Sequence, residues 1–222
     1  MNFIYLANIN KLPWFVLQDQ KKKILSYSAQ LEIDKFKFDQ DKCRSLVGKM
    51  LLLYALQRHE QFQQSRLPVI DYGLYRKPYI RTIKGHFNIS HAHDWVACVY
   101  SCNGEVGIDI EHITPINILD YHDVMTENEY QRALNDPQFD FFQLWTLKEA
   151  IMKAQGQGFY LPPSSFELPS PFHNDDIIEI NHTHWFLYSQ SFTNEYKLSL
   201  ASLYPTDGQV QVIPLQPDQF WQ

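Results

Sequence analysis

Two stretches with helical periodicity, far apart in the sequence, set the plan of this chain. In residues 41–58, apolar side chains recur at steps of three and four, at Leu46, Met50, Leu53 and Leu56. This spacing is typical of one face of a helix. Residues 139–154 repeat the pattern, and Gly156 and Gly158, which favour a helix end, follow them. The sequence therefore predicts two long helices, one in each half of the chain.

Short strand patterns surround both predicted helices. We expect strands at residues 2–7, 87–89, 95–100, 106–111, 177–180, 185–188 and 196–203. Asn103 and Gly104 favour a tight hairpin between the third and fourth of these strands. Thr126 and Glu129 have the spacing of a capping box, which predicts a short helix.

The order of these elements predicts an α+β fold with two halves of similar plan. The halves divide near Gly104, into residues 1–103 and 104–222. Each half contains one long helix and a small, mostly antiparallel sheet.

Charge and composition exclude several classes of protein. The net charge is −6, and it is uneven: residues 1–58 carry +5, and the remainder carries −11. The basic charge of residues 1–58 favours binding of an anionic ligand. A solvent-exposed basic surface without a ligand explains this charge equally well. The acidic balance and the absence of a recognisable motif argue against nucleic-acid binding. No apolar run approaches the roughly 20 residues of a membrane span. Three cysteines without zinc or redox spacing favour a cytoplasmic protein.

Acidic residues alternate along the predicted strand at 106–111. Asp109 and Glu111 lie on one face of a strand there, and Ile108 and Ile110 lie on the other. Two neighbouring carboxylates repel each other, and a divalent cation removes this repulsion. Magnesium is the natural candidate because it prefers hard oxygen ligands. The alternative is a solvent-exposed strand face with two ordinary surface acids. Judged from this segment alone, that alternative is the commoner one.

The second predicted helix adds a third acid. Trp145, Glu149 and Lys153 are spaced by four residues and lie in one stripe. Glu149 can complete a three-carboxylate site, and Lys153 can reach a phosphate oxygen one turn away. The alternative is a surface ion pair between these two residues, but Trp145 in the same stripe favours a covered face.

Ser90 and His91 lie where an apolar strand gives way to a polar turn. Their surroundings lack the G-x-S-x-G pattern of a hydrolase nucleophile. A zinc site of His86, His91 and His93 has neither thiolate spacing nor a helical H-E-x-x-H to support it.

Three motifs occur in order: F-N-I-S-H at 87–91, G-I-D-I-E at 107–111 and W-T-L-K-E-A-I-M-K-A-Q-G-Q-G-F at 145–159. Together they resemble the signature of the Sfp-type 4′-phosphopantetheinyl transferases. Residues 41–48, Lys77-Pro78 and Glu129-Tyr130 resemble weaker family motifs. The resemblance implies a monomer with two halves related by a pseudo-twofold axis, and coenzyme A bound in the cleft between them.

The resemblance also implies an activity and its catalytic residues. The family transfers phosphopantetheine from coenzyme A to a serine of an apo acyl or peptidyl carrier protein, with Mg²⁺. Asp109, Glu111 and Glu149 correspond to the magnesium ligands. Glu149 is also the expected general base, and Lys153 is expected to contact the diphosphate of coenzyme A.

The coenzyme A site implied by the resemblance involves four more residues. Arg44 and His91 would hold the 3′-phosphate, and Lys77 and Ser90 would line the nucleotide pocket. Residues 29–34 are neutral to acidic where family members often have a basic loop, so we expect a weaker or shifted grip on coenzyme A.

Two other functions fit parts of the pattern. Another magnesium-dependent phosphohydrolase would use the three acids but would not explain the ordered motifs around them. A non-catalytic homologue that only binds carrier proteins would be expected to have lost Asp109, Glu149 or Lys153, and all three are present.

Overall fold

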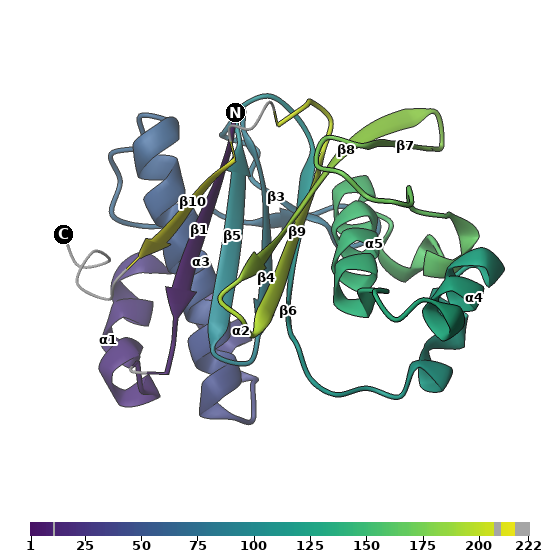
Figure 1. The fold of residues 1–222 in the computed structure, drawn as a ribbon. Coiled ribbons are helices and arrows are strands. Elements are labelled where there is room, and N and C mark those ends of the chain that lie inside the picture. The colour runs from purple at the N-terminus through teal and green to yellow at the C-terminus, as the bar shows by residue number, and fades with distance from the viewer. Residues whose placement is uncertain (11, 207–209, 216–222) are drawn as a thin grey trace.

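The computed structural model describes residues 1–10, 12–206 and 210–215. Two four-stranded sheets lie in the middle of the molecule, with α1–α3 on one side and α4 and α5 on the other (Figure 1). The first half contains β1 (Asn2–Asn8), α1 (Trp14–Ile24), α2 (Tyr27–Asp34), α3 (Asp39–His59), β2 (Asp71–Tyr72), β3 (Pro78–Tyr79), β4 (His86–Ala92) and β5 (Trp95–Ser101).

The second half begins directly after β5. It contains β6 (Val106–His112), η1 (Ile118–Val124), α4 (Glu127–Asn135), α5 (Phe141–Gln155), η2 (Gly158–Tyr160), η3 (Pro163–Ser165), β7 (Ile177–Ile180), β8 (Thr183–Phe192), β9 (Tyr196–Ser202) and β10 (Gln211–Leu215). None of the helices in the described ranges has the length and apolar content needed to cross a bilayer.

The two sheets share one strand plan. The first has the order β10-β1-β5-β4 and the second the order β6-β9-β8-β7. In each half, the first strand pairs antiparallel with the last strand of a hairpin, after a long helix. This confirms the predicted α+β fold of two similar halves. The parallel partner of β1 is β10, so the chain returns to the first sheet after β9. The division at residues 103 and 104 stays a prediction.

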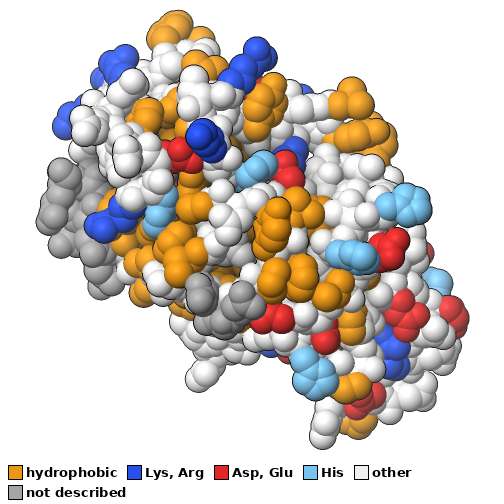
Figure 2. Space-filling model, turned by 90° about the horizontal axis from the view of Figure 1, so that it is seen from above, with side chains coloured by type: hydrophobic (Ala, Val, Ile, Leu, Met, Phe, Trp, Pro, Cys, Tyr) orange, Lys and Arg blue, Asp and Glu red, His pale blue; other side chains and the backbone are white. Residues whose placement is uncertain are grey.

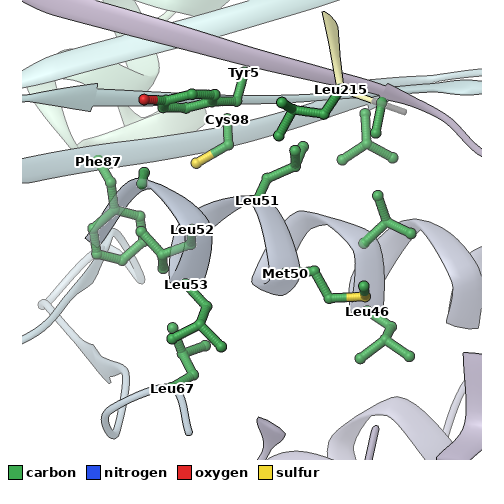
Figure 3. Close-up of a cluster of buried hydrophobic side chains, with 14 of the residues drawn as sticks. Tyr5, Leu46, Met50, Leu51, Leu52, Leu53, Leu67, Phe87, Cys98 and Leu215 are labelled. Atoms are coloured by element: carbon green, nitrogen blue, oxygen red, sulfur yellow. The ribbon is translucent and has the colours of Figure 1, made fainter. Parts of the chain in front are cut away.

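Three apolar layers hold the halves together. The face of α3 packs on one side of the first sheet, where Tyr5, Phe87 and Cys98 meet the leucines of the helix (Figure 3). The second sheet packs on α5 with Leu147 and Ile151. Between the sheets lies an inner layer of residues from β1, β4, β5, β6 and β9: Ile4, Leu6, Ala92, Ala97, Val99, Val106, Ile108, Ile110, Tyr196, Leu198 and Leu200. Both sheets are therefore buried on both faces.

Positive and negative side chains are unevenly distributed over the surface. In Figure 2, Lys and Arg side chains lie mainly toward the end that carries α1–α3, and Asp and Glu side chains lie mainly toward the end that carries α4. This agrees with the positive charge of residues 1–58 and the negative charge of the remainder.

Two local expectations are wrong. The strands on either side of Asn103 and Gly104 do not form a hairpin, because β1 and β4 occupy both edges of β5 and β6 pairs with β9. Residues 29–34, expected as a loop, lie in α2, whose first turn is capped by the Ser26 side chain. The capping box of Thr126 and Glu129 is confirmed at the start of α4.

A half-buried histidine closes the C-terminal end of α3. The ring of His59 stacks between Phe3 at 3.8 Å and Tyr100 at 5.3 Å, measured between ring centroids. Its Nε2 is 2.7 Å from the Tyr5 hydroxyl. Burial and the charge of Arg58 lower the pKa of His59, although Glu60 opposes this shift.

We expect His59 to make stability depend on pH. The folded-state pKa of His59 lies below the ordinary value of about 6.5. The neutral ring therefore contributes its full share to the free energy of unfolding above that pH. The contribution is lost as the pH falls through the folded-state pKa, since the unfolded chain then binds more protons. Urea unfolding of the wild type and of His59→Gln at several pH values measures this. The wild type should lose more stability on acidification than the variant, and parallel curves would contradict the assignment.

Candidate active site

Helix α5 lies directly on strand β6 because Gly107 has no side chain. A Cβ atom at Gly107 would collide with the carbonyl oxygen of Ala150 and the backbone nitrogen of Ala154. Asp140 caps the N-terminal end of the helix, and its carboxylate accepts a hydrogen bond of 2.9 Å from Gln143 N. Gly156, in the left-handed region with φ 75°, caps the C-terminal end. These features fix α5 across the strand that carries the acids.

The predicted division of faces on β6 is confirmed. Ile108 and Ile110 enter the inner apolar layer between the sheets. Asp109 projects from the opposite face and meets Lys153 of α5. Alternation along one strand therefore separates the apolar core from the polar site.

Asp109 is the most enclosed acid of this group, with a side chain only 4% exposed. Its Oδ1 accepts hydrogen bonds from Lys153 Nζ at 2.6 Å and from Ser90 Oγ at 2.8 Å. Its Oδ2 is buried without a hydrogen-bond partner among the described residues. A buried oxygen of this kind costs free energy unless a further ligand satisfies it.

Glu111 and Glu149 flank this centre. Burial and the nearby charge of Asp109 raise the pKa of Glu111 to about 7, although Trp145 and Lys153 oppose the shift. Burial also raises the pKa of Glu149, with the charge of Lys153 opposing and that of Asp109 adding to the shift. The two carboxylates are thus destabilised in their charged forms by the protein itself.

Lys153 stands between the acids. Its Nζ lies 3.7 Å from Glu149 Oε2 and 3.2 Å from Ser90 Oγ. Burial disfavours its charged form, but the carboxylates of Asp109, Glu149 and Glu111 outweigh burial and raise the pKa of Lys153. The lysine therefore stays protonated and presents one positive charge to the site.

Trp145 joins the stripe on α5 to the strand. Its Nε1 donates to Glu111 Oε1 at 3.4 Å, and the indole is partly covered. The prediction that this face of the helix is covered is confirmed.

Arg44 and His91 lie in the first half, on α3 and β4. Arg44 Nε donates to the carbonyl oxygen of His93 at 2.8 Å, and its Nη1 pairs with Asp41 at 2.9 Å. The His91 side chain reaches solvent, yet desolvation by the surrounding protein and the charges of Arg44 and Lys153 lower its pKa. Arg44 is thus held by Asp41 and the His93 carbonyl oxygen, and its charge acts on His91 together with that of Lys153.

Lys77 has a different environment. Its Nζ pairs with Glu105 and donates to the carbonyl oxygen of Ala154 at 2.6 Å. The ammonium group therefore lies at the C-terminal end of α5, next to the residue that follows Lys153.

Comparison with known proteins identifies the family. Residues 105–201 match the model of the 4′-phosphopantetheinyl transferase superfamily, and residues 17–103 match that of the 4′-phosphopantetheinyl transferase N-terminal region. The chain belongs to the Sfp-type 4′-phosphopantetheinyl transferase family.

Named relatives cover most of the chain. The transferase gsp of Aneurinibacillus migulanus is 34% identical over 181 residues, 79% of this chain and 75% of the relative. The transferase Sfp of Bacillus subtilis (strain 168) is 29% identical over 202 residues, 85% of this chain and 88% of the relative. The transferase AcpT of Escherichia coli (strain K12) is 31% identical over 170 residues, 73% of this chain and 75% of the relative.

The acids of this transferase fit a magnesium ion by their chemistry. The donors are hard carboxylate oxygens, one of them buried without a partner. Their mutual repulsion would be relieved by a divalent cation. In the part of the chain that the structure describes, no three His, Cys, Asp or Glu side chains are already grouped as metal ligands. The roles of Asp109, Glu111 and Glu149 as ligands stay predictions.

Two residues beside Lys77 have a role that sequence reasoning missed. Glu105 Oε1 lies 3.2 Å from Nδ1 of His86, a residue considered in the sequence only as part of a zinc site. A single glutamate ahead of a strand has no characteristic spacing, and its partners come from other parts of the chain. Only the three-dimensional structure brings them together.

We expect Gly107→Ala to destabilise this transferase, because its methyl group forces α5 away from β6. The cost should be about 1–3 kcal/mol or more, as for other overpacked cores. Denaturant unfolding measures it. Gly73→Ala is the matched control, since its Cβ would meet only Lys77 O at an ordinary 3.7 Å. Equal stability of the two variants would contradict the close contact.

Proposed function

We propose that this protein transfers the 4′-phosphopantetheine moiety of coenzyme A to a serine hydroxyl of an apo acyl or peptidyl carrier protein and releases 3′,5′-ADP. Family membership supports the activity. The observation that carries the residue assignments is the Lys153 ammonium group held between Asp109 and Glu149, where the two halves meet.

The proposed step forms one bond and breaks one. The carrier serine oxygen attacks the β-phosphorus of coenzyme A, and the bond from this phosphorus to the bridging oxygen breaks, so that 3′,5′-ADP leaves. In such transfers, a protein contributes chiefly positioning and charge neutralisation. Lys153 would place its positive charge beside the diphosphate oxygens, where negative charge develops.

Glu149 is the proposed general base. Its side chain is 14% exposed, so it can reach a substrate while most of it is shielded from water. Its raised pKa favours acceptance of a proton, because a more basic carboxylate takes up the serine proton more readily. Lys153 Nζ beside it would restrain the direction of the carboxylate.

Asp109, Glu111 and Glu149 are the proposed holders of Mg²⁺. When bound, the ion would act as a Lewis acid and template for the diphosphate. Ser90 donates to Asp109 Oδ1 and leaves Oδ2 free for a further ligand.

The nucleotide end of coenzyme A is proposed to bind the first half. Arg44 and His91 would contact the 3′-phosphate, and Ser90 would line the nucleotide pocket. The positive charges of Arg44 and Lys153 both lower the pKa of His91, so a positive potential reaches this side chain. A phosphate group would be favoured there.

We also propose a cytoplasmic monomer that binds no nucleic acid. The three cysteines are free thiols, as expected in a reducing compartment. The acidic net charge opposes binding to nucleic acid.

The activity is tested by incubating the protein with coenzyme A, Mg²⁺ and a panel of apo carrier proteins. Intact-mass analysis should show a carrier heavier by one phosphopantetheine moiety, and a carrier with its serine replaced by alanine should stay unmodified. Hydrolysis of the diphosphate without carrier modification would favour a phosphohydrolase instead. Binding of the carrier without modification would favour a non-catalytic homologue.

We expect Asp109→Asn and Glu149→Gln each to lower turnover by about a hundredfold or more, the usual scale for losing an acid–base or charge-positioning group. Both substitutions keep the side-chain shape, so the circular dichroism spectra should stay those of the folded protein. The control is Glu127→Gln on α4, whose side chain is 69% exposed. Near-normal turnover in both site variants would refute the proposed roles.

A further inference from the structure

Lys77 joins three parts of the chain that are far apart in the sequence. It comes just before β3 of the first half and pairs with Glu105, one residue before β6. It also donates to Ala154 O, in the last turn of α5, at 2.6 Å. The backbone of Gly156 packs on the lysine stem so closely that a Cβ at Gly156 would lie 2.9 Å from Lys77 Cδ.

The hydrogen bond from Lys77 to Ala154 O lies at the C-terminal end of α5, where a helix favours a donor with a positive charge. The last carbonyl groups of a helix have no partner within it, and a positive charge there interacts favourably with the helix dipole. Lys77, which lies outside the helix, gives Ala154 O a hydrogen-bond partner and places a positive charge at the C-terminal end of α5. The Lys77 side chain is 17% exposed, so little of it is free for another ligand.

Glu105 anchors the other side of this contact. Its Oε1 lies 3.2 Å from His86 Nδ1, at the start of β4. Burial raises the pKa of Glu105, but hydrogen bonds from His86 and Lys77 outweigh it and bring the pKa to about 2. The carboxylate is therefore charged at neutral pH and holds the lysine between β4, β6 and α5.

We propose that Lys77 is a positioning residue that fixes the C-terminal end of α5 on β6 and so keeps Lys153 against Asp109. Lys153 is covalently next to Ala154, and Asp109 lies four residues after Glu105, so a shift at this clamp moves both partners of the catalytic ion pair. This inference rests on the proposed function and departs from the nucleotide contact expected of Lys77.

Steady-state kinetics with coenzyme A and an apo carrier protein separate the two roles of Lys77. In Lys77→Met and in Glu105→Gln, kcat should fall by about ten- to a hundredfold, the effect of a small misplacement of reacting groups. The KM for coenzyme A should stay within about twofold, because ground-state binding is not lost. The double variant should be no slower than the slower single variant, since both act through one contact. Lys84→Met, at an exposed lysine between β3 and β4, is the control.

Hydrogen exchange gives a readout that does not depend on turnover. Amides of residues 150–156 should exchange faster in Lys77→Met and Glu105→Gln than in the wild type, whereas α3 should stay unchanged. If Lys77→Met does not fold, Glu105→Gln alone carries the test. A raised KM for coenzyme A in Lys77→Met, with unchanged kcat and unchanged exchange of α5, would overturn the proposal in favour of a nucleotide contact. An inactive wild type with the predicted exchange pattern would refute the proposed function and leave the clamp standing.

Discussion

The contact between α5 and β6 at Gly107 is the constraint on which the site depends. With the helix backbone against the strand, residues on the facing stripe of α5 reach side chains of β6 at hydrogen-bond distance. Lys153 can then bond to Asp109, and Trp145 can reach Glu111. A larger residue at position 107 would separate these groups. The attraction between the ammonium and carboxylate groups, which are 2.6 Å apart, weakens as they are separated. The charge arrangement of the site therefore depends on the packing of α5 on β6.

The inner apolar layer explains why the site lies where the halves meet. β6 buries Ile108 and Ile110 against the first sheet, so its other face carries Asp109 toward α5. Asn88 of β4 accepts a hydrogen bond of 3.1 Å from Ile108 N, which places the neighbouring Ser90 within 2.8 Å of Asp109. Residues of both halves thus contribute to one cluster.

Sequence periodicity predicted the features that depend on local geometry. The long helices and the faces of β6 follow from spacing alone, because side-chain direction in a strand or helix repeats regularly. The false hairpin near Gly104 shows the limit: a turn signal is local, whereas pairing depends on which strand edges are free. The same limit applies to the site. The acids could be proposed from their spacing, but the contacts of Lys77 with Glu105 and Ala154 join segments with no shared pattern.

Helix α5 makes two separate sets of charged contacts, one with α4 and the loop after α5, the other with β6. In the first, the fully buried Lys148 pairs with Glu129 at 2.5 Å and donates to the carbonyl oxygens of Pro163 and Phe166. Such a pair adds little net stability, yet losing one partner is costly, so it holds α4 and the following loop to the helix. In the second set, the carboxylates of Asp109 and Glu111 on β6 and of Glu149 on α5 repel one another. The buried apolar contacts of α5 and the positive charge of Lys153 oppose this repulsion, so the three acids stay together.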